Sequence, residues 1–243
     1  MNPHDRVALI TGAARRVGRA IALRLAREGC HIAAHYHTSR KPAEALQAEI
    51  RALGRECELF SANLADPRET DALAPHVITR FGRLDILINN ASTFEPMRLD
   101  EFSRETWNRD LAINLTAPMA LSHAAASELK KRSGRIINLC DAAITRPLPD
   151  YLAYAVSKGG LETLTRALAR ALAPEVNVVG VAPGVAEFPE SYDQQTRDRL
   201  VSRIPLKRAG SPEDIAALIA FLLREGDYIT GAIIPADGGR HIT

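Results

Sequence analysis

Short apolar runs alternate with longer amphipathic stretches along the whole chain. The apolar runs are nearly continuous, which predicts strands that are buried on both faces of a parallel sheet. We expect these strands at 7–10, 30–34, 84–88, 135–139 and 176–181. Helical spacing of apolar positions predicts helices over 16–28, 41–53, 67–81, 103–131, 152–173 and 211–224. Alternation repeated this often predicts an α/β fold, a single-domain doubly wound parallel sheet flanked by helices.

One stretch, 183–205, breaks the pattern and has the least regular sequence. Pro183, Gly184, Pro189 and Pro205 bracket a polar run there. In a doubly wound fold this segment would overhang the carboxyl edge of the sheet, where ligands bind. We therefore expect a loop that borders the functional site, and the pattern does not fix its conformation.

Composition argues against several classes of function. The chain has 243 residues, 46% of them hydrophobic, which is enough for one full core. Its 31 basic and 29 acidic residues give a net charge of +2, so nothing favours nucleic acid or a membrane surface as a partner. The sequence lacks a signal-peptide pattern and an apolar run of the roughly 20 residues that span a membrane. The three cysteines share no metal or redox spacing, so we expect a cytoplasmic protein without a metal site.

Candidate chemistry is concentrated at Tyr154 and Lys158. Residues four apart share one face of a helix, so the ammonium group would lie about one turn from the phenol. Such an ammonium stabilises the phenolate, and we expect it to lower the pKa of Tyr154 from roughly 10 towards neutrality. Asp141, thirteen residues before the tyrosine, adds a carboxyl group that can accept, donate or relay a proton. These three residues predict a site of acid–base chemistry.

A glycine-containing turn follows the first predicted strand and leads directly into a helix. Gly12 allows a tight turn and Gly18 lets helix and sheet approach, so that backbone N–H groups face a bound pyrophosphate. The residues of this turn that we expect to contact a cofactor are Gly12, Arg15, Arg16, Val17 and Gly18. By itself the motif is also compatible with an ordinary strand–turn–helix connection.

The end of the second predicted strand favours one dinucleotide over another. Tyr36, His37, Thr38 and Ser39 include no acidic residue, whereas an Asp or Glu there would bind the ribose hydroxyls of NAD. Donors and positive charge at this point suit the 2′-phosphate of NADPH/NADP+ instead. We expect all four residues to border the cofactor, with His37 and Ser39 on the phosphate.

Taken in order, these motifs resemble the short-chain dehydrogenase/reductase family, whose fold is of the Rossmann type. The resemblance spans the whole chain: Tyr154 and Lys158 match the YxxxK signature, and 11–18 matches the TGxxxGxG turn except at Arg16. It implies a nucleotide-binding part at about 1–140 and a catalytic and substrate-loop part at about 141–243. It also implies a homotetramer, with the helices at 103–131 and 152–173 as interfaces.

The resemblance gives roles to further residues. Asn114 would bend its helix and hold a water beside Lys158, as a fourth catalytic residue with Asp141 and Tyr154, although a purely structural role is equally open for a buried Asn. Lys158 would bind the nicotinamide ribose. The cofactor contacts implied in the same way are Asn63, Leu64, Asn90, Ala91, Ser92, Tyr154, Lys158, Pro183 and Gly184.

Several departures from the family pattern agree with one another. Arg16 and Ser92 replace glycines, and Asp141 stands where most members have Ser. Together they resemble the pteridine reductases of the family. That resemblance implies hydride transfer from NADPH to a C=N bond of a pterin, dihydrobiopterin or dihydromonapterin, with dihydrofolate as a further candidate. The substrate-site residues implied are Arg16, Ser92, Phe94, Asp141, Tyr151 and Tyr154.

Two other functions remain open at this point. One is an NADPH-dependent carbonyl reductase acting on a 3-oxoacyl thioester or another ketone, which a Ser in place of Asp141 would have favoured. The other is a dinucleotide-sensing protein without turnover, against which Asn114, Tyr154 and Lys158 argue. Phe94 also has a competing role, since an isolated aromatic residue is commonly part of the core.

Overall fold

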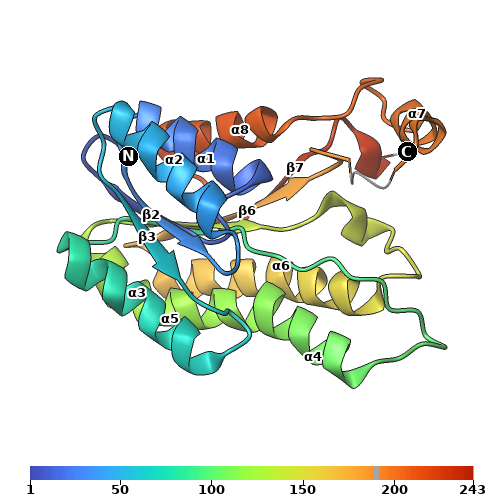
Figure 1. The fold of residues 1–243 in the computed structure, drawn as a ribbon, viewed down its shortest axis with the longest axis horizontal. Coiled ribbons are helices and arrows are strands. Elements are labelled where there is room, and N and C mark those ends of the chain that lie inside the picture. Colours follow the sequence, from blue (N-terminus) through green and yellow to red (C-terminus); the bar gives the residue numbers. More distant parts are fainter. Residues whose placement is uncertain (189–191, 243) are drawn as a thin grey trace.

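A parallel sheet runs through the centre of the protein (Figure 1). The computed structural model describes residues 1–188 and 192–242. Within these residues the sheet has seven strands in the order β3-β2-β1-β4-β5-β6-β7, so the chain changes direction across the sheet between β1 and β4. Ligands bind at such a switch point in doubly wound folds. The strands are β1 (Val7–Ile10), β2 (His31–Tyr36), β3 (Cys57–Ser61), β4 (Ile86–Asn89), β5 (Arg135–Leu139), β6 (Asn177–Pro183) and β7 (Ile233–Ala236).

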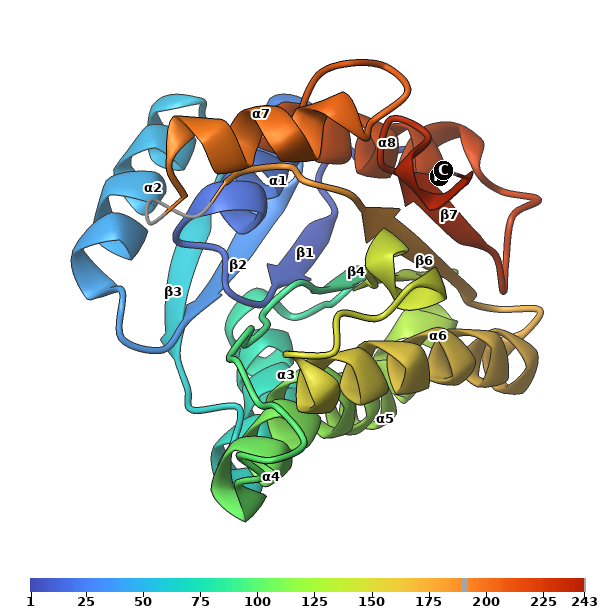
Figure 2. The ribbon, with the colours of Figure 1, turned by 90° about the vertical axis from the view of Figure 1, so that its right-hand side faces the viewer.

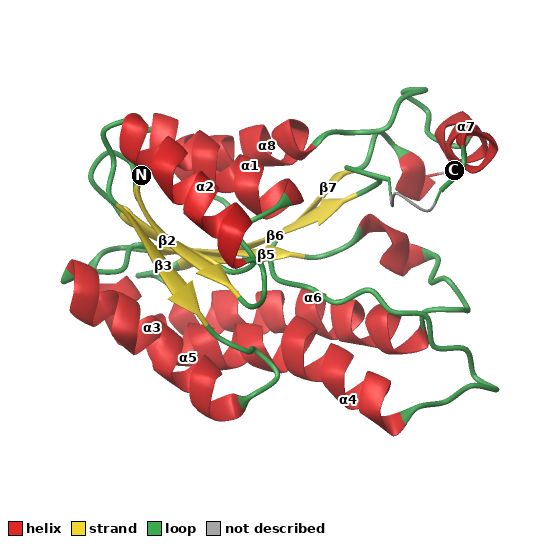
Figure 3. Cartoon of the chain, in the orientation of Figure 1, coloured by secondary structure: helices red, strands yellow, loops and turns green. Residues whose placement is uncertain are grey.

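Helices cover both faces of the sheet (Figure 3). One layer contains α1 (Arg16–Arg27), α2 (Arg40–Ala52) and α8 (Pro212–Glu225). The opposite layer contains α3 (Pro67–Phe81), α4 (Arg104–Leu111), α5 (Ala117–Lys131) and α6 (Leu152–Leu172). A short α7 (Gln194–Ser202) lies beyond the carboxyl edge of the sheet. None of the helices in the described part of the chain combines the length and apolar character that a membrane crossing requires.

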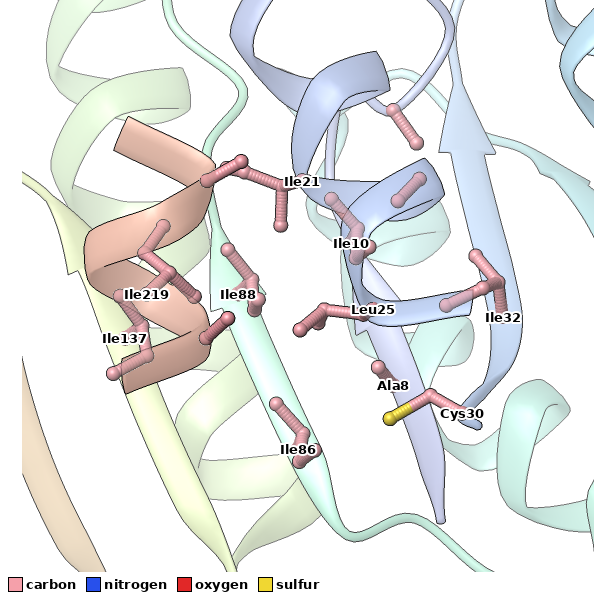
Figure 4. Close-up of a cluster of buried hydrophobic side chains, with 14 of the residues drawn as sticks. Ala8, Ile10, Ile21, Leu25, Cys30, Ile32, Ile86, Ile88, Ile137 and Ile219 are labelled. Carbon is pink, nitrogen blue, oxygen red and sulfur yellow. The ribbon is translucent and has the colours of Figure 1, made fainter. Parts of the chain in front are cut away.

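Burial on both faces of the sheet explains the continuous apolar runs in the strands. Consecutive residues of β1 point to opposite sides: Ile10 belongs to the cluster under α1 and α8, and Leu9 to the cluster under α3 and α5. Figure 4 shows Ile10 and its neighbours against Ile21, Leu25 and Ile219. Each fully buried aliphatic side chain of this kind contributes about 1.5–3 kcal/mol. This packing holds the strand ends, and with them the edge of the sheet, in fixed positions.

The predicted parallel sheet is confirmed, and the five expected strands agree with the structure to within two residues. Two strands were missed, and both lie at edges of the sheet. β3 and β7 are largely half-buried and β7 contains Pro235, so neither shows the apolar run of a central strand.

Two predictions about helices were wrong. The stretch 103–131 is not one helix, because a π-helical turn at Ala112–Thr116 separates α4 from α5. The stretch 183–205 is not entirely loop, because it contains α7. α7 buries none of its residues, so its sequence lacks the apolar stripe that predicts a helix. Pro189, one of the residues that defined this stretch, lies outside the described residues.

Candidate active site

A cavity of about 900 Å³ opens at the carboxyl edge of the sheet, the edge that Figure 2 presents. Its walls come from the segments that follow β1 to β6, together with α6, α7 and the C-terminal segment. The predicted site residues that line the cavity are Gly12, Arg15, Arg16, Val17, Gly18, His37, Asn63, Leu64, Asn90, Ala91, Ser92, Phe94, Asp141, Tyr151, Tyr154, Lys158, Pro183 and Gly184. The predicted residues outside the lining are Tyr36, Thr38, Ser39 and Asn114.

The turn between β1 and α1 is as close-packed as its glycines predict. Gly12 has a φ of +63°, which glycine adopts without strain. A Cβ on Gly18 would lie 2.2 Å from the backbone oxygen of Gly12 and 2.6 Å from Nδ2 of Asn90, so no other residue fits there. Arg15 is exposed at the N-cap of α1. The turn is therefore a preformed cradle of the kind that receives a pyrophosphate.

Arg16 departs from the family pattern and has an unusual backbone conformation. Its φ of +51° lies in the left-handed region, which costs a non-glycine residue about 1–2 kcal/mol. Its Nε donates to Oε2 of Glu187 at 2.7 Å, and both side chains are about half exposed. A surface ion pair of this kind contributes at most about 1 kcal/mol. The guanidinium group thus lies at the cavity and joins the phosphate turn to the segment after β6.

His35 was not among the predicted site residues, and it supports the phosphate turn from inside. Its Nδ1 accepts from the backbone N–H of Gly12 at 3.1 Å, and its Nε2 lies 3.0 Å from the carbonyl of Ala62. This pattern requires a neutral ring with the proton on Nε2. Burial lowers the pKa of His35 to about 4, which keeps the ring neutral near pH 7. The sequence did offer a signal for this role, because His35 is a polar residue inside the otherwise apolar run of β2.

The segment that follows β4 is hydrogen-bonded to the segment that follows β1. Nδ2 of Asn90 donates to the carbonyls of Thr11 and Gly12 at 2.8 and 3.2 Å. The hydroxyl oxygen of Thr11 accepts from the backbone N–H groups of Asn90 and Ala91, each at 2.9 Å. Ser92, at the predicted glycine position, donates its hydroxyl to the carbonyl of Thr93. These bonds fix the two strand ends on either side of the switch point.

The predicted adenine-binding end is open and polar. Leu64 forms a buried wall, and Oδ1 of Asn63 accepts from the backbone N–H of Ala65 at 3.0 Å. His37 and Thr38 are exposed, and Ser39 directly precedes α2. Arg40 pairs with Glu44 along α2 at 2.9 Å.

The structure joins Tyr154 directly to Asp141. The phenol of Tyr154 donates to Oδ2 of the carboxylate. Oδ1 of Asp141 accepts from the backbone N–H of Ala143 at 2.7 Å, where it begins the short 3-10 turn η2 (Ala142–Thr145). Asp141 therefore caps a turn and faces the tyrosine at the same time.

The expected lowering of the tyrosine pKa is wrong for this structure. Burial and the neighbouring Asp141 carboxylate raise the pKa of Tyr154 well above its ordinary value. Nζ of Lys158 donates to the carbonyl of Leu139 at 2.6 Å and lies 5.8 Å from the centroid of the tyrosine ring. Burial lowers the pKa of Lys158. The tyrosine is therefore a firmly protonated acid, hydrogen-bonded to a carboxylate rather than to the lysine.

Asn114 lies in the π-helical turn and hydrogen-bonds to Thr93 and Ser157. Its Oδ1 accepts from the backbone N–H of Thr93 at 2.9 Å, and its Nδ2 donates to the Thr93 carbonyl and to Oγ of Ser157 at 3.1 and 3.0 Å. The π-helical turn that contains Asn114 separates α4 from α5. Ser157 immediately precedes Lys158 in α6, so Asn114 connects the segment after β4 to this helix.

Aromatic side chains form one wall beside Tyr154. Phe94 stacks on Tyr151 with ring centroids 4.1 Å apart and an interplanar angle of 4°. It meets Tyr154 edge-on at 4.7 Å and 81°. Phe94 is 44% exposed, so it is not the core residue that the alternative required. Phe94, Tyr151 and Tyr154 thus form one aromatic cluster in the lining of the cavity.

The described residues include no group of side chains that could bind a metal ion. Within 1–188 and 192–242, no three His, Cys, Asp or Glu side chains are grouped so as to hold a metal ion.

Known proteins are similar to this chain over nearly its whole length. A family model described as Enoyl-(Acyl carrier protein) reductase matches residues 12–241. The 3-oxoacyl-[acyl-carrier-protein] reductase FabG of Staphylococcus aureus is 36% identical over 240 residues, covering 97% of this chain and 98% of that protein. The short-chain dehydrogenase/reductase FrzI of Cladobotryum sp. is 33% identical, with 98% of each chain covered.

A solved structure is also similar over nearly the whole length. It is a blue fluorescent protein from a metagenomic library in complex with NADPH, with a TM-score of 0.93, 34% identity and 99% of each chain covered. The family model and the solved structure each match the chain from the phosphate turn to the C-terminal segment. The chain belongs to the short-chain dehydrogenase/reductase family.

Proposed function

We propose that this protein is an NADPH-dependent reductase that adds hydride and a proton across a C=N bond of a dihydropterin. The observation that carries the proposal is the hydrogen bond from Tyr154 to Asp141 in the wall of the cavity. Asp141 provides a carboxylate at the position where most family members have the hydroxyl of a Ser. Phe94 and Tyr151 add a flat aromatic surface beside this pair, which suits a heteroaromatic substrate.

The residues present fit an NADPH molecule. The turn that contains Gly12 and Gly18 lines the cavity at the start of α1, where a pyrophosphate binds in such folds, and His37 and Ser39 follow the strand β2, where the sequence predicts the 2′-phosphate. The similar metagenomic protein binds NADPH. When bound, NADPH supplies the hydride from its nicotinamide ring. We assign Lys158 to the nicotinamide ribose, next to the proton donor.

The proton comes from the protein. Tyr154 gives its phenolic proton to the nitrogen of the C=N bond as hydride reaches the adjacent carbon, and water then returns a proton to the phenolate. Because the carboxylate of Asp141 disfavours a neighbouring negative charge, the phenolate is short-lived. Asp141 also offers an acceptor to the N–H groups at the polar edge of a pterin. A ketone presents no such N–H group, so the carboxylate has more to bind on a pterin.

The second candidate is a carbonyl reductase. It is favoured by the names of the similar proteins, since several are 3-oxoacyl-[acyl-carrier-protein] reductases at 35–36% identity over nearly the whole chain. By those names alone it would rank above the pterin hypothesis. Asp141 is the observation against it, because a hydroxyl can donate a hydrogen bond to a ketone oxygen whereas a carboxylate can only accept one.

We also propose that the chain assembles as a homotetramer through α5 and α6. Met119 on α5 and Val156 on α6 are 44% and 50% exposed, which leaves apolar side chains on both helices for a partner subunit to cover. Light scattering of the purified protein measures its mass directly. A monomer of 26.5 kDa would refute this assembly.

One assay panel separates the candidate activities. Oxidation of NADPH is followed with dihydrobiopterin, dihydromonapterin, dihydrofolate and acetoacetyl thioester as substrates. The proposal predicts turnover with the pterins and little with the thioester. Turnover with the thioester alone would establish the carbonyl reductase, and NADPH binding without any turnover would establish a sensing protein.

A further inference from the structure

The wall of the cavity carries many more basic than acidic side chains. Among the described residues that line it, seven are Lys or Arg and two are Asp or Glu, whereas the whole chain has 31 against 29. Both acidic groups are engaged, since Asp141 accepts from Tyr154 and Glu187 pairs with Arg16. The seven basic residues are Arg15, Arg16, Arg146, Lys158, Arg199, Arg203 and Arg240. The cavity therefore attracts anionic groups.

The cofactor does not account for all of these cations. Arg15, Arg16 and Lys158 belong to the phosphate turn and the catalytic helix, where NADPH is proposed to bind. The other four come from different elements: Arg146 follows η2, Arg199 and Arg203 lie on or directly after α7, and Arg240 begins the short 3-10 turn η3 (Arg240–Ile242).

These elements lie next to the hydrogen-bonded pair of Tyr154 and Asp141. η2 begins directly after Asp141, and η3 packs beside η2. The backbone N–H of Leu206, which closely follows α7, donates to the carbonyl of Gly238 at 3.2 Å and so brings the end of α7 next to η3. One end of the cavity is therefore enclosed by η2, η3 and α7, and we call it the distal end.

One face of α7 forms part of the distal end. Thr196, Arg199, Leu200 and Arg203 all line the cavity, and their spacing of three, four and seven residues puts them on one helical face. None of the residues of α7 is buried. The helix is therefore a wall of the cavity and not a part of the core.

His241, in η3, adds an imidazole to the lining of the distal end. Nδ1 of His241 lies 2.9 Å from Oδ2 of Asp237, and the same oxygen accepts the backbone N–H of His241 at 2.6 Å. Oδ1 of Asp237 accepts from the backbone N–H of Gly239 at 3.0 Å. The buried carboxylate holds the ring in place, so that Nε2 is the ring atom left to bind a ligand.

We infer that the distal end binds an anionic tail of the substrate, a carboxylate or phosphate attached to the pterin ring, with Arg199 as a principal contact. This inference rests on the proposed pterin reduction. Arg203 and Arg240 take part in other contacts. Arg199 also lies near enough to Asp193 to help lower the pKa of that carboxyl. We test Arg199 because it lies on α7, on the face that lines the cavity.

The test compares two substrates with one pterin head and different tails. Dihydrobiopterin has a neutral tail and dihydrofolate ends in two carboxylates. At saturating NADPH, we expect Arg199→Gln to raise the KM for dihydrofolate about tenfold and to leave the KM for dihydrobiopterin within about twofold. Arg199→Lys should keep most of the dihydrofolate affinity, because it keeps the charge. Arg27→Gln is the matched control, since this exposed arginine lies in the last turn of α1, outside the cavity lining.

The outcomes separate the two claims. If the wild-type protein reduces neither pterin, the proposed function fails and the inference falls with it. If both pterins are reduced but Arg199→Gln affects them equally, the function stands and the anionic subsite is refuted. A rise in the KM for NADPH instead would place Arg199 in the cofactor site and would also refute the subsite.

Discussion

His35 links the phosphate turn to the residue after β3 from a buried position, and its titration should be visible in the stability of the protein. The neutral ring accepts from Gly12 and faces the carbonyl of Ala62. A protonated ring would lose the first of these bonds and leave a buried charge. The pKa of His35 falls from 6.5 to about 4 on folding, so the unfolded chain binds this proton more tightly than the folded one.

The size of the effect follows from that difference. As far as His35 is concerned, the free energy of unfolding is highest above about pH 6.5. It falls as the pH drops from about 6.5 towards 4, and it no longer changes below about pH 4. The full difference of about 2.5 pKa units corresponds to about 3 kcal/mol. Between pH 7.5 and 5.0 the part that is lost is about 2 kcal/mol.

Urea unfolding at pH 7.5 and 5.0 measures this loss. In His35→Asn, which cannot titrate, we expect the difference between the two free energies of unfolding to be about 2 kcal/mol smaller than in the wild type. His76→Asn, on the exposed surface of α3, is the matched control and should behave like the wild type. An identical pH dependence in His35→Asn and the wild type would refute the assignment of a buried neutral histidine.

Two further predictions concern the cradle and the proton donor. Gly18→Ala should cost about 2 kcal/mol, or about 6 °C in Tm for a chain of this size, because its Cβ would lie 2.2 Å from the Gly12 oxygen. It should also weaken NADPH binding in a fluorescence titration, and unchanged Tm and affinity would contradict the close packing. Tyr154→Phe should lower kcat for pterin reduction at least about a hundredfold while NADPH still binds, and wild-type turnover would exclude Tyr154 as the acid.

Much of the fold could be predicted because the central strands are buried on both faces. Strands such as β1 and β5 therefore carry uninterrupted apolar runs. The edge strands β3 and β7 and the exposed helix α7 escaped prediction for the opposite reason. Their residues are half-buried or exposed, so the periodicity of hydrophobic positions is weak there.

The site was predictable where the backbone restricts the residue type. Gly12 and Gly18 follow from local geometry, and the four-residue spacing of Tyr154 and Lys158 places them on one helical face. Their electrostatics could not be predicted, because burial and the direction of the Asp141 carboxylate depend on tertiary packing. His35 was missed for a similar reason, since its partners lie 23 and 27 residues away in the chain.

Selectivity between a C=N bond and a ketone, measured before and after the carboxylate is removed, tests the central claim most directly. The measurement is the ratio of kcat/KM for dihydrobiopterin to kcat/KM for acetoacetyl thioester, in the wild type and in Asp141→Ser. We predict a ratio well above one in the wild type and a fall of at least about tenfold in Asp141→Ser, as the pterin loses its acceptor and the ketone gains a hydroxyl. A wild-type ratio below one, or a ratio that the substitution leaves unchanged, would contradict the role given to Asp141.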